Sequence, residues 1–310
     1  MPDLIFHHYP ASPFSEKIRL IFGRKNLRWQ SVIIPVIMPK DDVVALTGGY
    51  RKTPILQIGA DIYCDTALIA DVVEELHPSP TIYPEDTGAE ARILAQWADS
   101  TLFWTVIPYV MQPAGLQSMF GDVPPAHVQA FIADRKAFRG TAPRMAAAEA
   151  AGSLQIYLER LERMLSDSRA FLLGDAPTIA DFSAYHSFWF IRRAGSLAAI
   201  LEPNSHLGDW MTRIKQIGHG DSTELSSGEA IDSAREGSCA ATANLPFHDA
   251  HGIALGEQVR IAPTDYGIDP VQGELVICAA NELAVRRTDS RAGEVIVHFP
   301  RLGFQLSRTA

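Results

Sequence analysis

The sequence has little of what secreted or membrane-spanning proteins need. Its three cysteines, Cys64, Cys239 and Cys278, lie far apart and form no C-x-x-C motif, so neither a disulfide framework nor a zinc site is indicated. No run reaches the ~18 apolar residues of a membrane-spanning helix, and the N-terminus has no basic segment followed by a long apolar one. We therefore expect a soluble cytoplasmic protein without a membrane partner or a metal.

Basic residues are also fewer than acidic ones. The chain has 27 Lys and Arg against 36 Asp and Glu, for a net charge of -9. Binding to phosphate backbones needs an excess of basic charge, so nucleic acid is not an expected partner. With 310 residues, of which 47% are hydrophobic, the chain is long enough for a sizeable core and for roughly two or three domains.

The pattern near the N-terminus predicts a strand, a turn and a helix. Residues 4–6 form a short apolar run, and a helical stripe follows it at Phe14, Ile18, Ile21 and Phe22. Ser12 can cap this helix, and Pro13 suits its first turn because proline has no amide proton to lose.

Two interpretations of Ser12 remain open. In the first it is only a helix cap. In the second, its hydroxyl and the partial positive charge of the helix N-terminus together hold an anion such as a thiolate or a carboxylate.

A second motif follows about forty residues later. Residues 51–58 and 62–66 hold two short apolar runs separated by Gly59 and Asp61, which predicts a hairpin followed by a helix. With these pieces in this order, the chain resembles the thioredoxin-like N-terminal domain of the glutathione S-transferase superfamily, of the type with serine or cysteine in the N-terminal motif.

The resemblance implies a binding site for glutathione as co-substrate. Thr53 and Pro54 match a turn with a cis proline, where the residue before the proline offers its backbone to the cysteinyl group. Asp65 and Thr66 match the pair that receives the γ-glutamyl group. Ser12 matches the position that faces the glutathione sulfur, and is therefore the expected catalytic residue.

Three neighbouring residues complete the expected site. Lys40 and Lys52 can meet the glycine carboxylate of glutathione, although a lysine is often simply solvated. Tyr9 is the alternative to Ser12, because some classes of the family use a tyrosine near this strand end as the thiolate donor.

An acceptor pocket for the second substrate is expected between the first two domains. Aromatic side chains can line such a pocket beside the sulfur, although part of them can be ordinary core residues. The candidates are Phe14, Phe103, Trp104, Tyr109 and Trp189.

Breaks in the pattern divide the chain. Prolines cluster within residues 77–88, Thr178 and Asp181 have the spacing of a capping box, and five short β-type runs follow residue 252. We expect an α/β thioredoxin-like glutathione-binding domain (1–80), an all-α domain of the transferase C-terminal type (88–220), a helix and linker (221–252), and a small all-β, SH3-like barrel (253–310).

The predicted function is that of a glutathione S-transferase, active in detoxification, which directs the glutathione thiolate at a small electrophile. The alternatives are a non-catalytic glutathione-binding or scaffolding protein of the same fold and a glutathione-dependent isomerase or dehalogenase. The resemblance also implies a homodimer.

Overall fold

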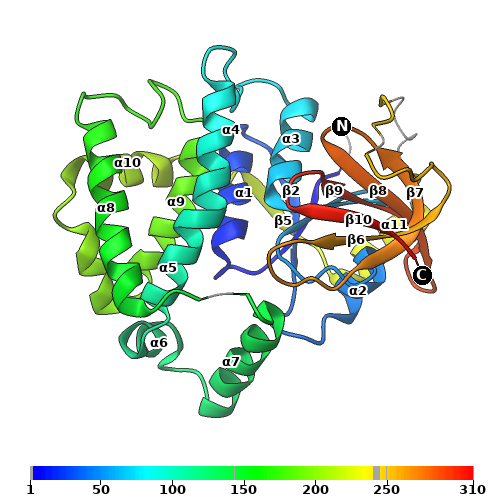
Figure 1. The fold of residues 1–310 in the computed structure, drawn as a ribbon, viewed down its shortest axis with the longest axis horizontal. Helices are drawn as coiled ribbons and strands as arrows, with labels where there is room; N and C mark the ends of the chain where they lie inside the picture. Colours follow the sequence, from blue (N-terminus) through cyan, green and yellow to red (C-terminus); the bar gives the residue numbers. More distant parts are fainter. Residues whose placement is uncertain (1–2, 143, 240–244, 249, 310) are drawn as a thin grey trace.

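Helices gather on one side of the molecule and strands on the other (Figure 1). The computed structural model describes residues 3–142, 144–239, 245–248 and 250–309. Within these ranges no helix has both the length and the apolar character that crossing a bilayer requires.

The N-terminal region has the predicted thioredoxin-like arrangement. Strand β1 pairs in parallel with β2 and antiparallel with β3, and β3 and β4 form the predicted hairpin, in which Ile55 lies opposite Cys64. The elements are β1 (Ile5–His8), α1 (Pro13–Arg24), β2 (Arg28–Ile33), α2 (Asp41–Thr47), β3 (Ile55–Ile58), β4 (Asp61–Cys64) and α3 (Thr66–Leu76).

The following region is helical, as predicted. Its elements are α4 (Gly88–Trp97), a π-helical turn (Ala98–Leu102), α5 (Phe103–Val110), α6 (Pro113–Phe120), α7 (Pro125–Arg139), α8 (Ala147–Leu165), α9 (Ile179–Arg192), a 3-10 segment (Gly195–Leu201) and α10 (Ser205–Gln216).

Helix α9 is the centre of this region because it is buried over almost its whole length. Its predicted capping box is present: the Asp181 carboxylate accepts a hydrogen bond from the Thr178 amide, and the Thr178 side chain caps the backbone at Asp181. The Asp181 carboxylate also accepts hydrogen bonds from the Leu172 amide and the Trp210 indole. One carboxylate thus fixes the start of α9, the preceding loop and α10.

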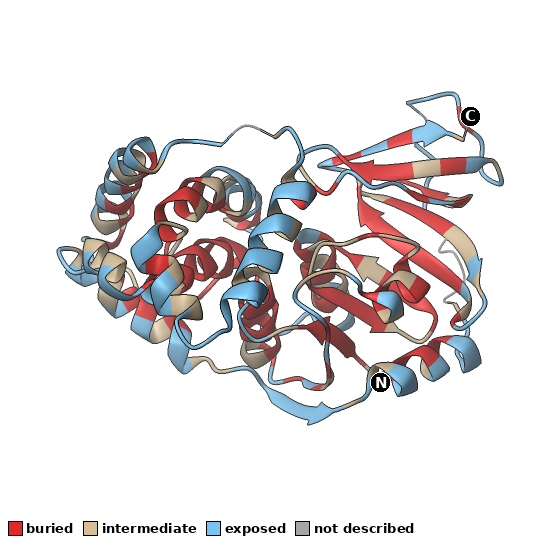
Figure 2. Cartoon of the chain, turned by 90° about the horizontal axis from the view of Figure 1, so that it is seen from below, coloured by how far each residue is buried: buried red, intermediate tan, exposed pale blue. Residues whose placement is uncertain are grey.

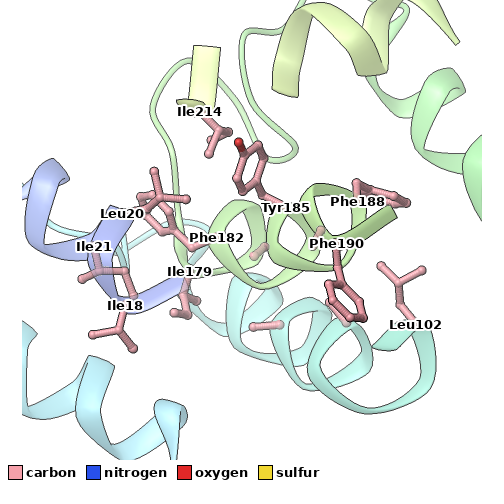
Figure 3. Packing of buried hydrophobic residues seen from close by; sticks show 14 of the residues in the cluster. Ile18, Leu20, Ile21, Leu102, Ile179, Phe182, Tyr185, Phe188, Phe190 and Ile214 are labelled. Atoms are coloured by element: carbon pink, nitrogen blue, oxygen red, sulfur yellow. The ribbon is translucent and has the colours of Figure 1, made fainter. Parts of the chain in front are cut away.

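Helix α1 packs against α9 and joins the two regions. Figure 3 shows Ile18 and Ile21 of α1 close to Ile179 of α9. Both α1 side chains are fully buried, and burying a side chain of this size is worth roughly 2 kcal/mol.

The five C-terminal strands are also present where the sequence predicts them, and they continue the N-terminal sheet. Strand β9 pairs in parallel with β4, which gives one sheet in the order β10-β6-β7-β8-β9-β4-β3-β1-β2-β5. The five strands are β6 (Gln258–Pro263), β7 (Val271–Cys278), β8 (Glu282–Asp289), β9 (Gly293–Pro300) and β10 (Phe304–Arg308). A further strand that the sequence did not predict, β5 (Asp221–Glu224), pairs in parallel with β2 at the opposite edge of the sheet. The SH3-like description of the C-terminal strands stays a prediction.

Helix α11 (Ser227–Glu236) lies in the segment expected to hold a helix and linker. It begins at a capping box of Ser226 and Glu229 and contacts α2 and β9. Ala230, Ile231 and Ala234 form its buried face, and Figure 2 shows buried and exposed residues alternating along helices at the molecular surface. Residues 240–244 and 249 of the expected linker lie outside the described residues.

A buried histidine links the C-terminal strands to the N-terminal sheet. His298 of β9 lies with Nε2 3.0 Å from an oxygen of Asp61 in β4 and with Nδ1 2.6 Å from an oxygen of Glu282 in β8. Burial alone lowers the pKa of His298, but the hydrogen bonds and charges of the two carboxylates outweigh it and raise the pKa. The protonated imidazole donates to both strands.

We expect His298→Gln to weaken this link in a pH-dependent way. Because the folded-state pKa of His298 is raised, its stabilisation is complete below the unfolded value of about 6.5 and disappears as the pH rises through the folded value. The loss in unfolding free energy should be about 3 kcal/mol near pH 6 and smaller near pH 9, measured by urea denaturation. The exposed His127→Gln is the control; an equal loss at both pH values contradicts the assignment.

Candidate functional site

The N-terminus of α1 presents a serine at the wall of a cavity. Ser12 is the N-cap, and its Oγ accepts a hydrogen bond from the Ser15 amide at 3.2 Å. The predicted cap is therefore present. The side chain is almost completely buried and lines a cavity of about 510 Å³.

The cavity lies between the first two regions and is mainly apolar. Of the aromatic residues predicted for the acceptor pocket, Phe14, Phe103 and Trp104 line it. The rings of Phe14 and Phe103 are 4.7 Å apart, centre to centre. The start of α1 and helix α5 therefore form one wall of the cavity.

The other two predicted acceptor residues lie elsewhere. Tyr109 is buried, and its hydroxyl donates to the carbonyl oxygen of Leu197. Trp189 packs against the helical core and lies under the guanidinium of Arg193. Neither lines the cavity, because their positions on α5 and α9 turn them toward the helical core.

The loop before β3 carries Lys52 and Thr53, whereas Lys40 lies at the N-terminus of α2 and is not part of the cavity lining. The Thr53–Pro54 peptide is cis, and Thr53 and Lys52 line the cavity with Tyr9. Lys40 donates to the Thr53 hydroxyl at 3.2 Å, and its ammonium lies 5.8 Å from the centre of the Tyr9 ring.

The surroundings of Lys40 lower the pKa of its ammonium group to about 8. Burial is the main cause, and the positive charges of Arg135 and Arg51 add to it against the opposing effect of Asp134. Lys40 therefore loses part of its charge only slightly above neutral pH.

The pair Asp65 and Thr66 lies at the N-terminus of α3. Asp65 has φ of 75°, a conformation that is strained for a residue with a side chain, and its carboxylate caps the Ala67 amide at 2.9 Å. Burial raises the pKa of Asp65. The Thr66 hydroxyl accepts a hydrogen bond from Lys17.

Lys17 belongs to a buried polar cluster that the sequence did not reveal. Its ammonium is 2.6 Å from Asp99 of the π-helical turn, which also accepts from Ser183 and lies 3.0 Å from His186. Burial tends to raise the pKa of Asp99, but the charge of Lys17 and the hydrogen bonds from His186 and Lys17 lower it overall. The cluster joins α1, α3 and α9 directly behind Phe14, whose ring contacts His186.

The C-terminal strands supply a further wall of the site, also missed from the sequence. The loop after β6 places Tyr266 in the cavity lining, with its ring 4.9 Å from Trp104 and 5.1 Å from Phe138. The preceding Asp265 pairs with Lys52 at 2.6 Å. The only signal in the sequence is an acidic residue and an aromatic one in a turn, which is too common to indicate a site.

Comparisons with known proteins agree with this architecture. A model of the glutathione S-transferase N-terminal domain matches residues 6–81, and a model of the C-terminal domain matches residues 144–213. The crystal structure of a GST-like protein from Pseudomonas syringae is 40% identical, with 100% of both chains covered and a TM-score of 0.85. The chain belongs to the glutathione S-transferase superfamily.

Two other proteins match less of the chain at lower sequence identity. A glutathione S-transferase from Rhodospirillum rubrum shares the fold at 21% identity and a TM-score of 0.53, with 68% of this chain and 87% of that chain covered. The protein named FtsZ-localized protein A from Caulobacter vibrioides is 24% identical over 184 residues, which are 57% of this chain and 72% of that protein.

Removing the buried cation should destabilise the site. We expect Lys17→Met to reduce the unfolding free energy by about 3 kcal/mol, because Asp99 then loses its main countercharge in a buried position. The double variant Lys17→Met/Asp99→Leu should recover part of the loss in urea denaturation. If Lys17→Met alone leaves the denaturation midpoint unchanged, the ion pair does not stabilise the fold.

Proposed function

We propose that the protein is a glutathione transferase in which Ser12 stabilises the thiolate of bound glutathione. The observation that supports this best is the position of the Ser12 hydroxyl, at the N-terminus of α1 and in the lining of a largely apolar cavity beside Thr53.

The hydrogen bonding of Ser12 suits a thiolate donor. Its oxygen accepts from the Ser15 amide, and within the described ranges the Ser12 hydroxyl donates to no other group. Its proton is thus available to an incoming anion. A hydrogen bond and a helix N-terminus directed at sulfur favour the charged form, and each unit by which the thiol pKa falls corresponds to about 1.4 kcal/mol.

The remaining site residues would hold the tripeptide. Thr53 would receive the cysteinyl backbone, Asp65 and Thr66 the γ-glutamyl group, and Lys40 and Lys52 the glycine carboxylate. Support comes from Lys52 and Thr53, which line the same cavity as Ser12, and from the hydrogen bond that Lys40 donates to Thr53. Asp65 and Thr66 lie at the N-terminus of α3 and are not part of the cavity lining.

The thiolate would then attack an electrophile in the cavity. In a displacement, a carbon–sulfur bond forms while the leaving group departs with its electron pair. Serine at positions 12 and 15 disfavours a mixed-disulfide mechanism there, because a hydroxyl does not exchange with disulfides.

We expect Ser12→Ala to raise the thiol pKa of bound glutathione by one to two units, since a hydrogen bond to a charged group is worth about 1.5–3 kcal/mol. Ultraviolet difference spectra over a pH range measure this pKa. Ser12→Gly serves as a second variant, because glycine lacks the hydroxyl yet weakens a helix cap by only a few tenths of a kcal/mol.

Tyr9→Phe is the matched comparison for the competing assignment. The Ser12 variants should both raise the thiol pKa, and Tyr9→Phe should leave it unchanged. If only the tyrosine variant raises the pKa, Tyr9 is the donor and the role of Ser12 is that of a cap.

A non-catalytic binding protein is the second candidate. It is favoured by the similarity to a protein named for localisation with FtsZ and by the additional C-terminal strands. Retention on glutathione-agarose without turnover of an aryl halide, an epoxide and an activated alkene would support it, as would co-sedimentation with FtsZ polymers. Turnover would favour the enzyme, and product analysis would then separate conjugation from isomerisation and dehalogenation.

Location and assembly complete the proposal. We infer that the protein acts in the cytoplasm, where glutathione is plentiful, in the detoxification of small electrophiles. Superfamily members commonly pair, so we propose a homodimer, which light scattering tests directly.

A further inference from the structure

One loop of the C-terminal strands lies against the N-terminal region and α7. Residues 264–270 connect β6 to β7. The Thr264 amide donates to the carbonyl oxygen of Gly303, and the Gly267 amide donates to the carbonyl oxygen of Phe138, both at 2.9 Å. Gly267 has φ of 59°, and a side chain at this position would collide with the Phe138 ring. The loop is therefore fastened at two points beside the cavity.

This loop brings a carboxylate to Lys52. An oxygen of Asp265 lies 2.6 Å from the Lys52 ammonium, and the same ammonium lies over the ring of Tyr266, 4.1 Å from its centre. The Lys52 side chain is only 12% exposed, whereas that of Asp265 is 50% exposed. Lys52 is thus held by two consecutive residues of the C-terminal loop, and Asp265 balances its positive charge.

Arg51, the residue before Lys52, is balanced in a similar way. Its guanidinium lies 2.8 Å from Asp134 of α7 and 3.9 Å from Asp269 of the C-terminal loop. Arg51 and Lys52 both line the cavity immediately before Thr53. The segment that carries Thr53 therefore presents two cations to the cavity, and both are already paired with carboxylates.

A paired cation attracts an incoming carboxylate less than a free one does. Lys40, the other lysine near Thr53, donates to the Thr53 hydroxyl and is not part of the cavity lining. Lys52 has three ammonium protons and can still donate a hydrogen bond, but a carboxylate that approaches it also meets the charge of Asp265. At separations of about 5 Å this repulsion is comparable to the attraction by Lys52. The pair should therefore distinguish poorly between a carboxylate and a neutral group.

We propose that Asp265 is a specificity-determining residue, which cancels the charge of Lys52 so that the site accepts thiol peptides with a masked terminal carboxylate as readily as glutathione. The inference rests on the proposed function, in which Lys52 receives the glycine carboxylate. An unpaired lysine would favour the free carboxylate, because a charge-assisted hydrogen bond is about twice as strong as a neutral one. The specificity at this end of the peptide is thus set by the C-terminal strands, outside the two matched transferase domains.

The affinities of two thiol peptides measure this preference. Glutathione and its glycinamide form, which differ only at the terminal carboxyl group, are titrated into the full-length protein by calorimetry. The wild-type protein should bind them with dissociation constants within about two-fold of each other. Asp265→Asn should bind glutathione about five-fold more tightly than the amide, because the Lys52 charge is then free to attract the carboxylate.

Variants of Lys52 test the charge balance from the other side. Lys52→Gln leaves Asp265 without its partner and should shift the preference toward the amide. The double variant Lys52→Gln/Asp265→Asn should again show no preference. Asp175→Asn is the matched control, because Asp175 is an exposed aspartate in the loop before α9 and its replacement changes the net charge by the same amount. It should bind both peptides as the wild type does.

Kinetics separates a specificity role from a structural one. With chlorodinitrobenzene as the electrophile, Asp265→Asn should lower the KM for glutathione about five-fold and leave the KM for the amide unchanged. The kcat and the thiol pKa of the bound peptide should stay constant, because Ser12 and not Asp265 is proposed to face the sulfur. An equal change in KM for the two peptides would indicate a structural role and overturn the inference.

The outcomes distinguish this inference from the proposed function. If the wild-type protein prefers the free carboxylate and Asp265→Asn leaves that preference unchanged, Asp265 has no part in specificity and the transferase proposal stands. If neither peptide binds to the wild type or to any variant, the protein is not a glutathione transferase, and the inference fails with it.

Discussion

The pairing of β9 with β4 is the constraint on which the rest of the structure depends. An unpaired edge strand exposes a row of backbone donors and acceptors that can recruit another chain. Here the edge of the thioredoxin-like sheet is occupied by the protein's own C-terminal strands, and His298 reinforces the junction through Asp61 and Glu282. The C-terminal region is therefore part of the same sheet as the candidate site.

Because of this junction, three regions of the chain contribute residues to the cavity lining. The start of α1 supplies Ser12, the helical region supplies Trp104, and the loop after β6 supplies Tyr266. Because β6 belongs to the continuous sheet, Tyr266 is held against Trp104 and Phe138. The Pseudomonas syringae relative matches the whole chain, so the C-terminal strands belong to an architecture that both proteins share.

Cationic side chains in the core differ from some of those at the cavity in whether they have carboxylate partners. In the core the buried cations Lys17 and Lys25 pair with Asp99 and Glu74, because an isolated buried charge is costly. Around the cavity, no carboxylate partner is found among the described residues for a partly exposed cation such as Arg139, and water can solvate its charge.

The sequence by itself predicted the thioredoxin-like start, the helical region and the five C-terminal strands, because these depend on local signals: apolar periodicity, capping residues such as Ser12 and Thr178, and proline-rich breaks. The superfamily followed from a resemblance of motifs, and strands such as β5 were not predicted. The sequence also indicated Phe14, Phe103 and Trp104 as residues of an apolar pocket. Only the tertiary structure decided which residues meet across the sheet and between regions. Tyr266 and Lys17 reach the site through contacts between distant segments, and no local pattern encodes such contacts.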